Sequence, residues 1–379
     1  MSSQAYTPGL KRKEHSLIRK ERKLPIRGDV LVKEGDVVSH DTTIAVTDVQ
    51  GDPTLINVAA ELELPIEDGG GIEEFMLKKK GDSVKKNETI AFKQSFFGLL
   101  KKEVRSPTAG TLVFFSDVTG QAVVEAPPNR VELKGYIPGT VVEVMPSEGA
   151  VIETYGAFIQ GIFGIGGETH GELTMVAKNP GDTLTPEQIT AEHSGKVIVG
   201  GALVTGAAVR KAVEVGVKGI VVGGITYGDL KDFLGYTIGV AITGNEEKGL
   251  TLIITEGFGE MKMLEKTFEL LKKFSGSLAC INGATQIRAG VMRPEVIIPR
   301  KLVDSKESSQ AESSTESMTI GTPVRLIRQP NFGATGTVVK LPVQLQVVET
   351  ESPVRVLTVK LENGKQVTVP RANVEIIEE

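Results

Sequence analysis

The stretch LVKEGDVV (Leu31–Val38) sets the pattern for the first half of the chain. It places Gly35 and Asp36 between two short apolar runs. The phrase recurs in degenerate form as LKKKGDSV (Leu77–Val84), MPSEGAVI (Met145–Ile152) and AKNPGDTL (Ala177–Leu184). Because glycine tolerates a positive φ, each copy predicts a strand, a tight turn and a second strand. The copies are unevenly spaced, which argues against a solenoid of fixed period.

Two other segments extend this pattern of strands and turns, SPTAGTLVFF (Ser106–Phe115) and GYIPGTVVEVMPSEG (Gly135–Gly149). With the recurring phrase they resemble, in pieces over residues 24–155, the barrel-sandwich hybrid of lipoyl- and biotinyl-carrier domains. In the carriers a lysine on an exposed hairpin accepts the prosthetic group. Here Val49 follows Asp48 where a lipoyl acceptor lysine would stand, and no Ala-Met-Lys-Met motif occurs. We therefore expect a β-rich, barrel-sandwich-like region over residues 24–184 that carries no cofactor.

Residues 185–300 alternate between apolar strands and helical runs. Strands are indicated at Lys196–Val199, Gly219–Gly224, Thr237–Gly244 and Thr251–Glu260, and helices at Ala207–Val217 and Met261–Phe274. In the last run the apolar residues recur at spacings of three and four, which is typical of an amphipathic helix. The alternation predicts a small α/β domain with a largely parallel sheet.

The tail segment IGTPVRLIRQPNFGATGTVVKL (Ile320–Leu341) resembles the KOW motif of the small SH3-like barrels in ribosomal proteins and transcription elongation factors. The match rests on Gly321, the turn at 331–333 and Gly336, although Thr322 stands where the family has Asp. A hairpin signal at Asn363-Gly364 completes an SH3-like β-barrel over residues 320–379. The predicted fold class is thus mixed and multidomain: a barrel-sandwich hybrid body, a small α/β domain and a C-terminal SH3-like barrel.

The KOW resemblance implies contact with RNA or with proteins of the transcription and translation machinery. The residues that would make this contact are Arg325, Arg328, Phe332, Lys340 and Arg371. The tail holds seven Lys or Arg against six acidic residues, so its excess of positive charge is small. A protein partner is therefore at least as well supported as RNA.

Length and charge limit the remaining possibilities. A chain of 379 residues is long enough for several modules, and its net charge of −5 argues against a wholly basic nucleic-acid binder. Residues 1–23 are expected to form a basic N-terminal arm, since the first 27 residues hold eight Lys or Arg and two Glu. Residues 301–319, rich in Ser and Glu, are expected to be a disordered linker that tethers the barrel flexibly.

The expected location is the cytoplasm. The charged N-terminus has no apolar core of a secretory signal, and no apolar run reaches the roughly 20 residues that span a bilayer. Cys280 is the only cysteine, so an intramolecular disulfide and a multi-cysteine metal cluster are both excluded. Its apolar flanks predict a buried, inert thiol.

Phosphate-binding and catalytic motifs are incomplete. The spacing of Gly201 and Gly206 matches a Walker loop, but Ala207 and Ala208 replace the Lys and Ser/Thr that bind phosphate and Mg²⁺. Thr169 stands where the glycine-rich segment 161–171 would need the last glycine of a dinucleotide fingerprint. Glu168, His170 and Glu172 alternate and could bind a metal, but a solvated strand face is the favoured interpretation, and no metal site is predicted.

Two functions remain open. The first is a non-enzymatic, multi-module interaction or adaptor protein. The second is an enzyme or ligand sensor that binds a small phosphorylated or carboxylate metabolite at the glycine-rich loops of the α/β domain. Its binding residues would be Gly201, Gly206, Gly257, Gly259, Asn282, Gln286, Arg288 and Arg293. The first is favoured because every catalytic motif is incomplete; RNA binding by the basic arm with the barrel is a third possibility, and homo-oligomerisation stays open.

Overall fold

The computed structural model describes residues 10–64, 71–95, 100–236, 248–285, 292–300, 318–326, 331, 334–342, 344–347, 353–361 and 363–378. Strands predominate, and they form several sheets and one half-barrel. None of the helices in these ranges is both long and apolar enough to cross a lipid bilayer.

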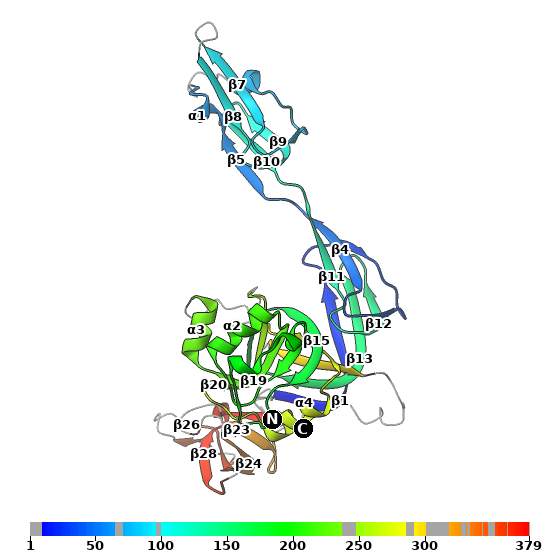
Figure 1. The fold of residues 1–379 in the computed structure, drawn as a ribbon, viewed down its shortest axis with the longest axis vertical. Helices are drawn as coiled ribbons and strands as arrows, with labels where there is room; N and C mark the ends of the chain where they lie inside the picture. Colours follow the sequence, from blue (N-terminus) through cyan, green and yellow to red (C-terminus); the bar gives the residue numbers. More distant parts are fainter. Residues whose placement is uncertain are drawn as a thin grey trace.

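A long antiparallel pair, β1 (Leu10–Lys23) and β13 (Gly149–Gln160), runs through the centre of the molecule (Figure 1). Leu10 and Ile18 of β1 are buried. Directly after Ile18, Arg19 pairs across the strands, with its Nε 2.6 Å from Glu153 Oε2. The basic segment expected to be an arm is therefore, from residue 10 on, a strand of the central sheet. The sequence suggested an arm because positive charge dominates this segment and only two of its residues, Leu10 and Ile18, are buried apolar ones.

The proximal β lobe, residues 24–49 and 129–148, packs against this pair. Its strands are β2 (Asp29–Val30), β3 (Val37–Val38), β4 (Thr43–Val49), β11 (Asn129–Lys134) and β12 (Gly139–Met145). β4 lies between β2 and β11, and β12 joins β3 to β13.

The distal β lobe, residues 53–64, 71–95 and 100–125, lies far from the other parts, at the upper end in Figure 1. It contains β5 (Pro53–Asn57), α1 (Val58–Glu61), the 3₁₀ turn Glu73–Phe75, β6 (Ser83–Val84), β7 (Thr89–Ser95), β8 (Leu100–Arg105), β9 (Gly110–Ser116) and β10 (Gln121–Glu125). The distal sheet has the strand order β5-β10-β9-β6 and covers a core of its own. Only the neighbouring segments 50–52 and 126–128 connect this lobe to the proximal one.

The recurring glycine-aspartate phrase makes the same turn in both lobes. Gly35 and Gly81 have φ of 88° and 94°. Asp36 Oδ2 accepts from Lys33 N at 2.8 Å, and Asp82 Oδ2 accepts from the equivalent lysine amide at the same distance. After the turn β3 pairs with β12, as β6 pairs with β9. The two lobes therefore contain the same strand-turn-strand unit.

Residues 163–282 form a parallel sheet with helices on both faces. The strands are β14 (Phe163–Ile165), β15 (Glu168–Met175), β16 (Thr183–Leu184), β17 (Val197–Val199), β18 (Leu203–Val204), β19 (Gly219–Ile225), β20 (Thr251–Phe258) and β21 (Leu278–Asn282). The helices are α2 (Gly206–Val215), α3 (Tyr227–Leu234) and α4 (Glu265–Lys273), with 3₁₀ turns at Pro186–Gln188 and Ala191–His193. The order β15-β17-β19-β20 is parallel, and the sequence predicts a largely parallel sheet here, while β14 and β21 pair antiparallel at its ends. The strand predicted at Thr237–Gly244 lies outside the described residues.

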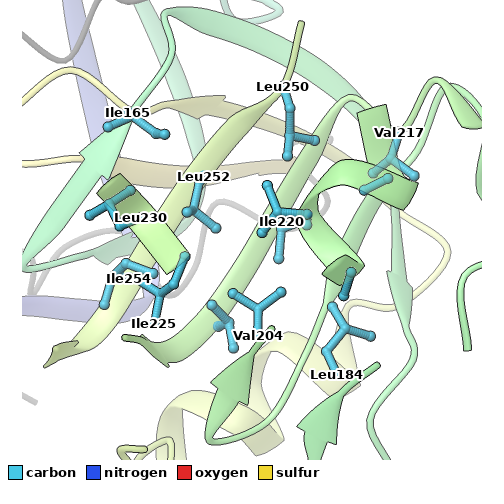
Figure 2. Packing of buried hydrophobic residues seen from close by; sticks show 14 of the residues in the cluster. Ile165, Leu184, Val204, Val217, Ile220, Ile225, Leu230, Leu250, Leu252 and Ile254 are labelled. Carbon is cyan, nitrogen blue, oxygen red and sulfur yellow. The ribbon is translucent and has the colours of Figure 1, made fainter. Parts of the chain in front are cut away.

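Two apolar layers hold this sheet. Figure 2 shows the first layer, where Ile220 and Leu252 of the strands meet Leu230 of α3. On the other face, α4 places Phe268 and Leu271 against β13 and β21. Helix α4 begins four residues later than the sequence predicts. Met261 N and Met263 N donate to carbonyls of other segments and hold residues 261–264 extended.

β22 (Glu295–Arg300) connects the parallel sheet to the central pair, because it pairs with both β21 and β13. Strands β14 and β15 precede residue 185 and still belong to the parallel sheet. The boundary predicted at 184/185 therefore runs through one sheet. The sequence obscured this because β15 alternates polar and apolar residues like the preceding antiparallel strands.

The C-terminal unit, residues 318–378, is a set of short antiparallel strands. They are β23 (Pro323–Leu326), β24 (Thr335–Lys340), β25 (Gln346–Val347), β26 (Pro353–Val354), β27 (Val356–Leu361), β28 (Gln366–Pro370) and β29 (Val374–Glu378), with a 3₁₀ turn at Arg371–Asn373. The hairpin predicted at Asn363-Gly364 joins β27 to β28. Residues 301–317 of the expected linker lie outside the described residues.

The C-terminal unit is docked on the parallel sheet rather than free. Arg325 of β23 and Glu256 of β20 are 2% and 4% exposed, and Arg325 Nη1 lies 2.5 Å from Glu256 Oε2. The backbone of β29 also pairs with the start of β1. The expectation of a flexibly tethered barrel is therefore wrong for this structure. The sequence predicts Arg325 as a macromolecule-binding residue because nothing in the sequence shows that its side chain is buried against Glu256.

Replacing Arg325 by Met should lower the free energy of unfolding by about 3–5 kcal/mol, because Glu256 would remain as a buried carboxylate without its cation. Urea denaturation followed by circular dichroism measures the change. The double variant Arg325→Met/Glu256→Gln should recover much of the loss, and Lys340→Met, at an exposed position, should have little effect. A double variant no more stable than Arg325→Met would contradict this interpretation.

Candidate functional site

At the carboxyl ends of the parallel strands, where the ligand site is predicted, the glycines make close contacts with other backbone segments. A Cβ at Gly201 would lie 2.4 Å from Asp182 O. Gly223 N donates to Gly201 O at 2.8 Å, and Met261 N donates to Ala202 O at 3.1 Å. Glycine at these positions permits close contacts between backbone segments, because it has no side chain in the way.

The amino end of α2 does not offer a site for an anion. Thr205 Oγ1 caps the helix by accepting from Ala208 N at 3.2 Å. A Cβ at Gly206 would lie 2.6 Å from the carboxylate of Asp229, so this acid lies beside the first turn. Its negative charge opposes phosphate there.

The other glycines and the polar segment have local roles. Gly257 pairs with Gly224 in the β19–β20 register, and Gly259 takes φ of 100° where the chain turns. Asn282 Oδ1 accepts from Ala284 N at 2.9 Å. Gln286 and Arg288 lie outside the described residues, and Arg293 is half-buried. Gly201, Gly257 and Gly259 lie close to Gly223 and Gly224, since a Cβ at Gly223 would lie 3.0 Å from Gly201 O and one at Gly224 would lie 2.1 Å from Gly259 O.

The substitution Gly201→Ala should destabilise the protein by at least about 2 kcal/mol, because its Cβ would overlap backbone atoms that cannot move aside easily. Gly228→Ala is the matched control. It lies in α3 with no atom closer than 3.9 Å to its added Cβ, and should stabilise by about 0.5–1 kcal/mol. Urea midpoints that fall equally in both variants would refute the packing role of Gly201.

Of the residues expected to bind a macromolecule, Arg325, Lys340 and Arg371 lie in the described part of the C-terminal unit. Arg325 is buried against Glu256, so it cannot reach a partner. Arg371 Nε and Nη2 lie 3.4 and 3.3 Å from backbone carbonyl oxygens of the same unit. Lys340 is exposed, and Arg328 and Phe332 lie outside the described residues.

The outer face of the distal sheet carries an apolar row that the sequence analysis did not identify. In the strand register Val123 of β10 lies between Leu55 of β5 and Phe114 of β9. Leu55 is 61% exposed and Phe114 is 51% exposed. Their neighbours Ile56 and Phe115 pack in the lobe core. Because side chains alternate along a strand, the row lies on the opposite, outer face.

This outer face is nearly uncharged. Its other described residues are Pro53, Asn57, Ser83, Thr111, Ser116, Gln121 and Glu125. No Lys or Arg occurs among them, and Glu125 Oε2 accepts from Gln50 Nε2 at 2.8 Å. The sequence signal for such a face is a strand that is apolar at successive positions, as in TLIN and LVFF.

A cluster of polar residues lies where the proximal lobe meets β15. His40 and Asp41 belong to the turn after β3, and His170 belongs to β15. Asp41 Oδ2 lies 3.2 Å from His40 Nε2 and 3.8 Å from His170 Nε2. The two imidazole centroids are 3.8 Å apart. Burial and the charge of His40 lower the pKa of His170, which favours its neutral form.

Ion pairs hold the strands around this cluster. Arg22 of β1 makes a bidentate contact with Glu168 of β15, at 2.5 and 2.7 Å. Glu295 of β22 accepts from Lys20 Nζ at 2.5 Å and from the buried Tyr136 hydroxyl at 3.1 Å. Glu168 and Glu172, which flank His170 on the strand face favoured as solvated, have separate partners, since Glu172 pairs with Lys196.

Tyr136 has a strained backbone that positions His40. Its φ is +66°, which is rare for a bulky residue. Its amide donates to His40 O at 3.0 Å. The guanidinium of Arg22 lies 5.4 Å from its ring centroid. Contacts on both sides of the residue therefore stabilise a conformation that alone would cost about 1–3 kcal/mol.

Cys280 lies opposite His170 in the β15–β21 register and is fully buried. Burial, with the nearby charges of Asp41 and Glu168, raises the pKa of its thiol to about 12. The native protein should therefore resist thiol-alkylating reagents at about pH 8, whereas urea-unfolded protein should react fully. Mass spectrometry measures the labelled fraction. Rapid labelling of the folded protein would contradict this expectation.

Comparison of the sequence with models of known protein families and with curated proteins gave no match.

Proposed function

We propose that this chain is a non-enzymatic interaction protein that binds another protein through the outer face of the distal sheet. The observation that carries the proposal is the apolar row Leu55–Val123–Phe114 on adjacent strands, in which Leu55 and Phe114 are exposed and Val123 is half-buried. Apolar side chains scattered singly over a surface are ordinary, but contiguous ones mark interaction sites. Val118, 83% exposed at the turn between β9 and β10, adds to the apolar area of this lobe.

The near absence of charge on the outer face of the distal sheet favours a protein partner over a nucleic acid. A protein that binds nucleic acid needs cations to replace the counterions of the phosphates. The described residues of the outer face contain no Lys or Arg, and their single ionisable group is the carboxylate of Glu125. An apolar, nearly neutral protein surface is therefore the complementary partner. Aromatic anchors such as Phe114 contribute strongly to contacts of this kind.

The position of the lobe also supports a binding role. The two connecting segments hold it away from the parallel sheet and the C-terminal unit (Figure 1). A partner could therefore cover the outer face without contacting the rest of the chain. The resemblance of the C-terminal unit to KOW barrels favours a partner from the transcription or translation machinery, and Lys340 would then be a second contact.

A photo-crosslinking amino acid at position 114 should capture a discrete protein in cells of the source organism. The same group at position 37 is the control, because Val37 is 84% exposed on the proximal lobe. The captured protein, once purified, should bind the unmodified chain, and Phe114→Ser should weaken binding at least about 10-fold. Val37→Ser should leave the affinity unchanged.

Three outcomes would overturn the proposal. Equal crosslinking from positions 37 and 114 would show a non-specific surface. Nuclease-sensitive products would indicate RNA. Crosslinks to the chain itself, with Phe114-dependent dimers in sedimentation, would assign the face to self-association.

A further inference from the structure

Two histidines and an aspartate from distant parts of the chain meet between the proximal lobe and β15. The nitrogen and oxygen atoms of His40, Asp41 and His170 that could ligate a metal all lie within 4.8 Å of one another. In a tetrahedral zinc site with bonds of about 2.0–2.1 Å, ligand atoms are roughly 3.3 Å apart. Asp41 Oδ2 is already 3.2 Å from one imidazole nitrogen and 3.8 Å from the other. Small side-chain adjustments would therefore complete three metal bonds.

The turn itself does not require these residues. The distal lobe contains a related turn, with Lys86 and Asn87 at the positions of His40 and Asp41, although Asn87 takes a φ of +66° and Asp41 has no positive φ. In both turns a side chain three residues on caps the first backbone amide, Thr42 Oγ1 at 2.9 Å and Glu88 Oε2 at 2.7 Å. Only the copy that faces β15 has the histidine and the aspartate. Their presence there needs a reason other than turn formation.

The surroundings fix both sides of the cluster. Arg22 engages both carboxylate oxygens of Glu168, two residues before His170, and so anchors β15 to β1. Tyr136 N donates to His40 O and holds the turn from the other side. The histidine side chains are 21% and 39% exposed, while Asp41 is 70% exposed, so an ion could enter from solvent on the aspartate side.

We propose that His40, Asp41 and His170 bind one divalent transition-metal ion, with zinc as the best fit to two imidazoles and a carboxylate. Water would supply the remaining ligand on the exposed side. The ion would fasten the proximal lobe to β15 and hence to the parallel sheet. This inference is independent of the distal interaction surface.

The test uses the full chain without an affinity tag, stripped of metal and titrated with Zn²⁺ against a chromophoric chelator. One ion per chain should bind. His170→Gln should weaken binding by at least about 100-fold, more than the loss of an outer partner usually costs. The double variant His40→Lys/Asp41→Asn introduces the residues of the distal turn and should weaken Zn²⁺ binding to the same extent. Without metal, its unfolding midpoint should equal that of the unmodified chain. His15→Ala, at an exposed histidine outside the cluster, is the control.

Two further measurements make the result decisive. Co²⁺ should give visible d–d absorption with the unmodified chain and with His15→Ala, and lose it in both cluster variants. Zn²⁺ should raise the melting temperature of the unmodified chain and of His15→Ala, in which the cluster is intact. It should leave the melting temperature of both cluster variants unchanged. Zn²⁺ affinity that is unchanged in the cluster variants, or no stronger than that of surface histidines, would overturn the proposal and leave an ordinary His–Asp contact.

Discussion

Backbone pairing along β13 is the constraint on which the arrangement of the molecule depends. Its edges bind β1 over nearly the whole strand, β12 near its start and β22 near its end. Through β12 it holds the proximal lobe, and through β22 it holds the parallel sheet. β1 in turn extends to β29 of the C-terminal unit. One strand of twelve residues thus links three parts that the sequence presents as separate.

The buried ion pair of Arg325 with Glu256 adds specificity to this arrangement. Two apolar surfaces could slide over each other with little change in energy. A buried guanidinium, by contrast, must meet its carboxylate. Glu256 also accepts from Leu264 N at 3.1 Å, which fixes the chain entering α4. The C-terminal unit therefore has one defined position on the parallel sheet.

Local patterns predicted local structure well. The glycine-aspartate turns, the parallel strands and the Asn363-Gly364 hairpin each follow from a few neighbouring residues. Predictions that depended on long-range contacts were less successful. Residues 10–23 looked like an arm because their charges are satisfied by carboxylates such as Glu153, far away in the sequence. Arg325 looked exposed because nothing near it in sequence reveals Glu256.

The candidate sites were also difficult to predict, because they too depend on contacts between residues far apart in the sequence. In the sequence, His170 stands out only through its alternation with Glu168 and Glu172 on its own strand, for which a solvated face is the favoured interpretation. The structure brings it together with His40 and Asp41, some 130 positions earlier, in a turn that no sequence motif connects to β15. The row of Leu55, Val123 and Phe114 was missed because it depends on strand register, which sets which side chains become neighbours.

The way the chain enters and leaves the distal lobe has an evolutionary consequence. Val49 pairs with Asn129 at the end of the proximal lobe, and Pro53 pairs with Glu125 at the start of the distal one. Entry and exit therefore lie side by side, as in a segment inserted into a hairpin loop. An ancestral gene could have gained this lobe by copying its own turn unit into that loop, without disturbing the host strands. The copy was then free to acquire a different surface while the original kept its place in the core.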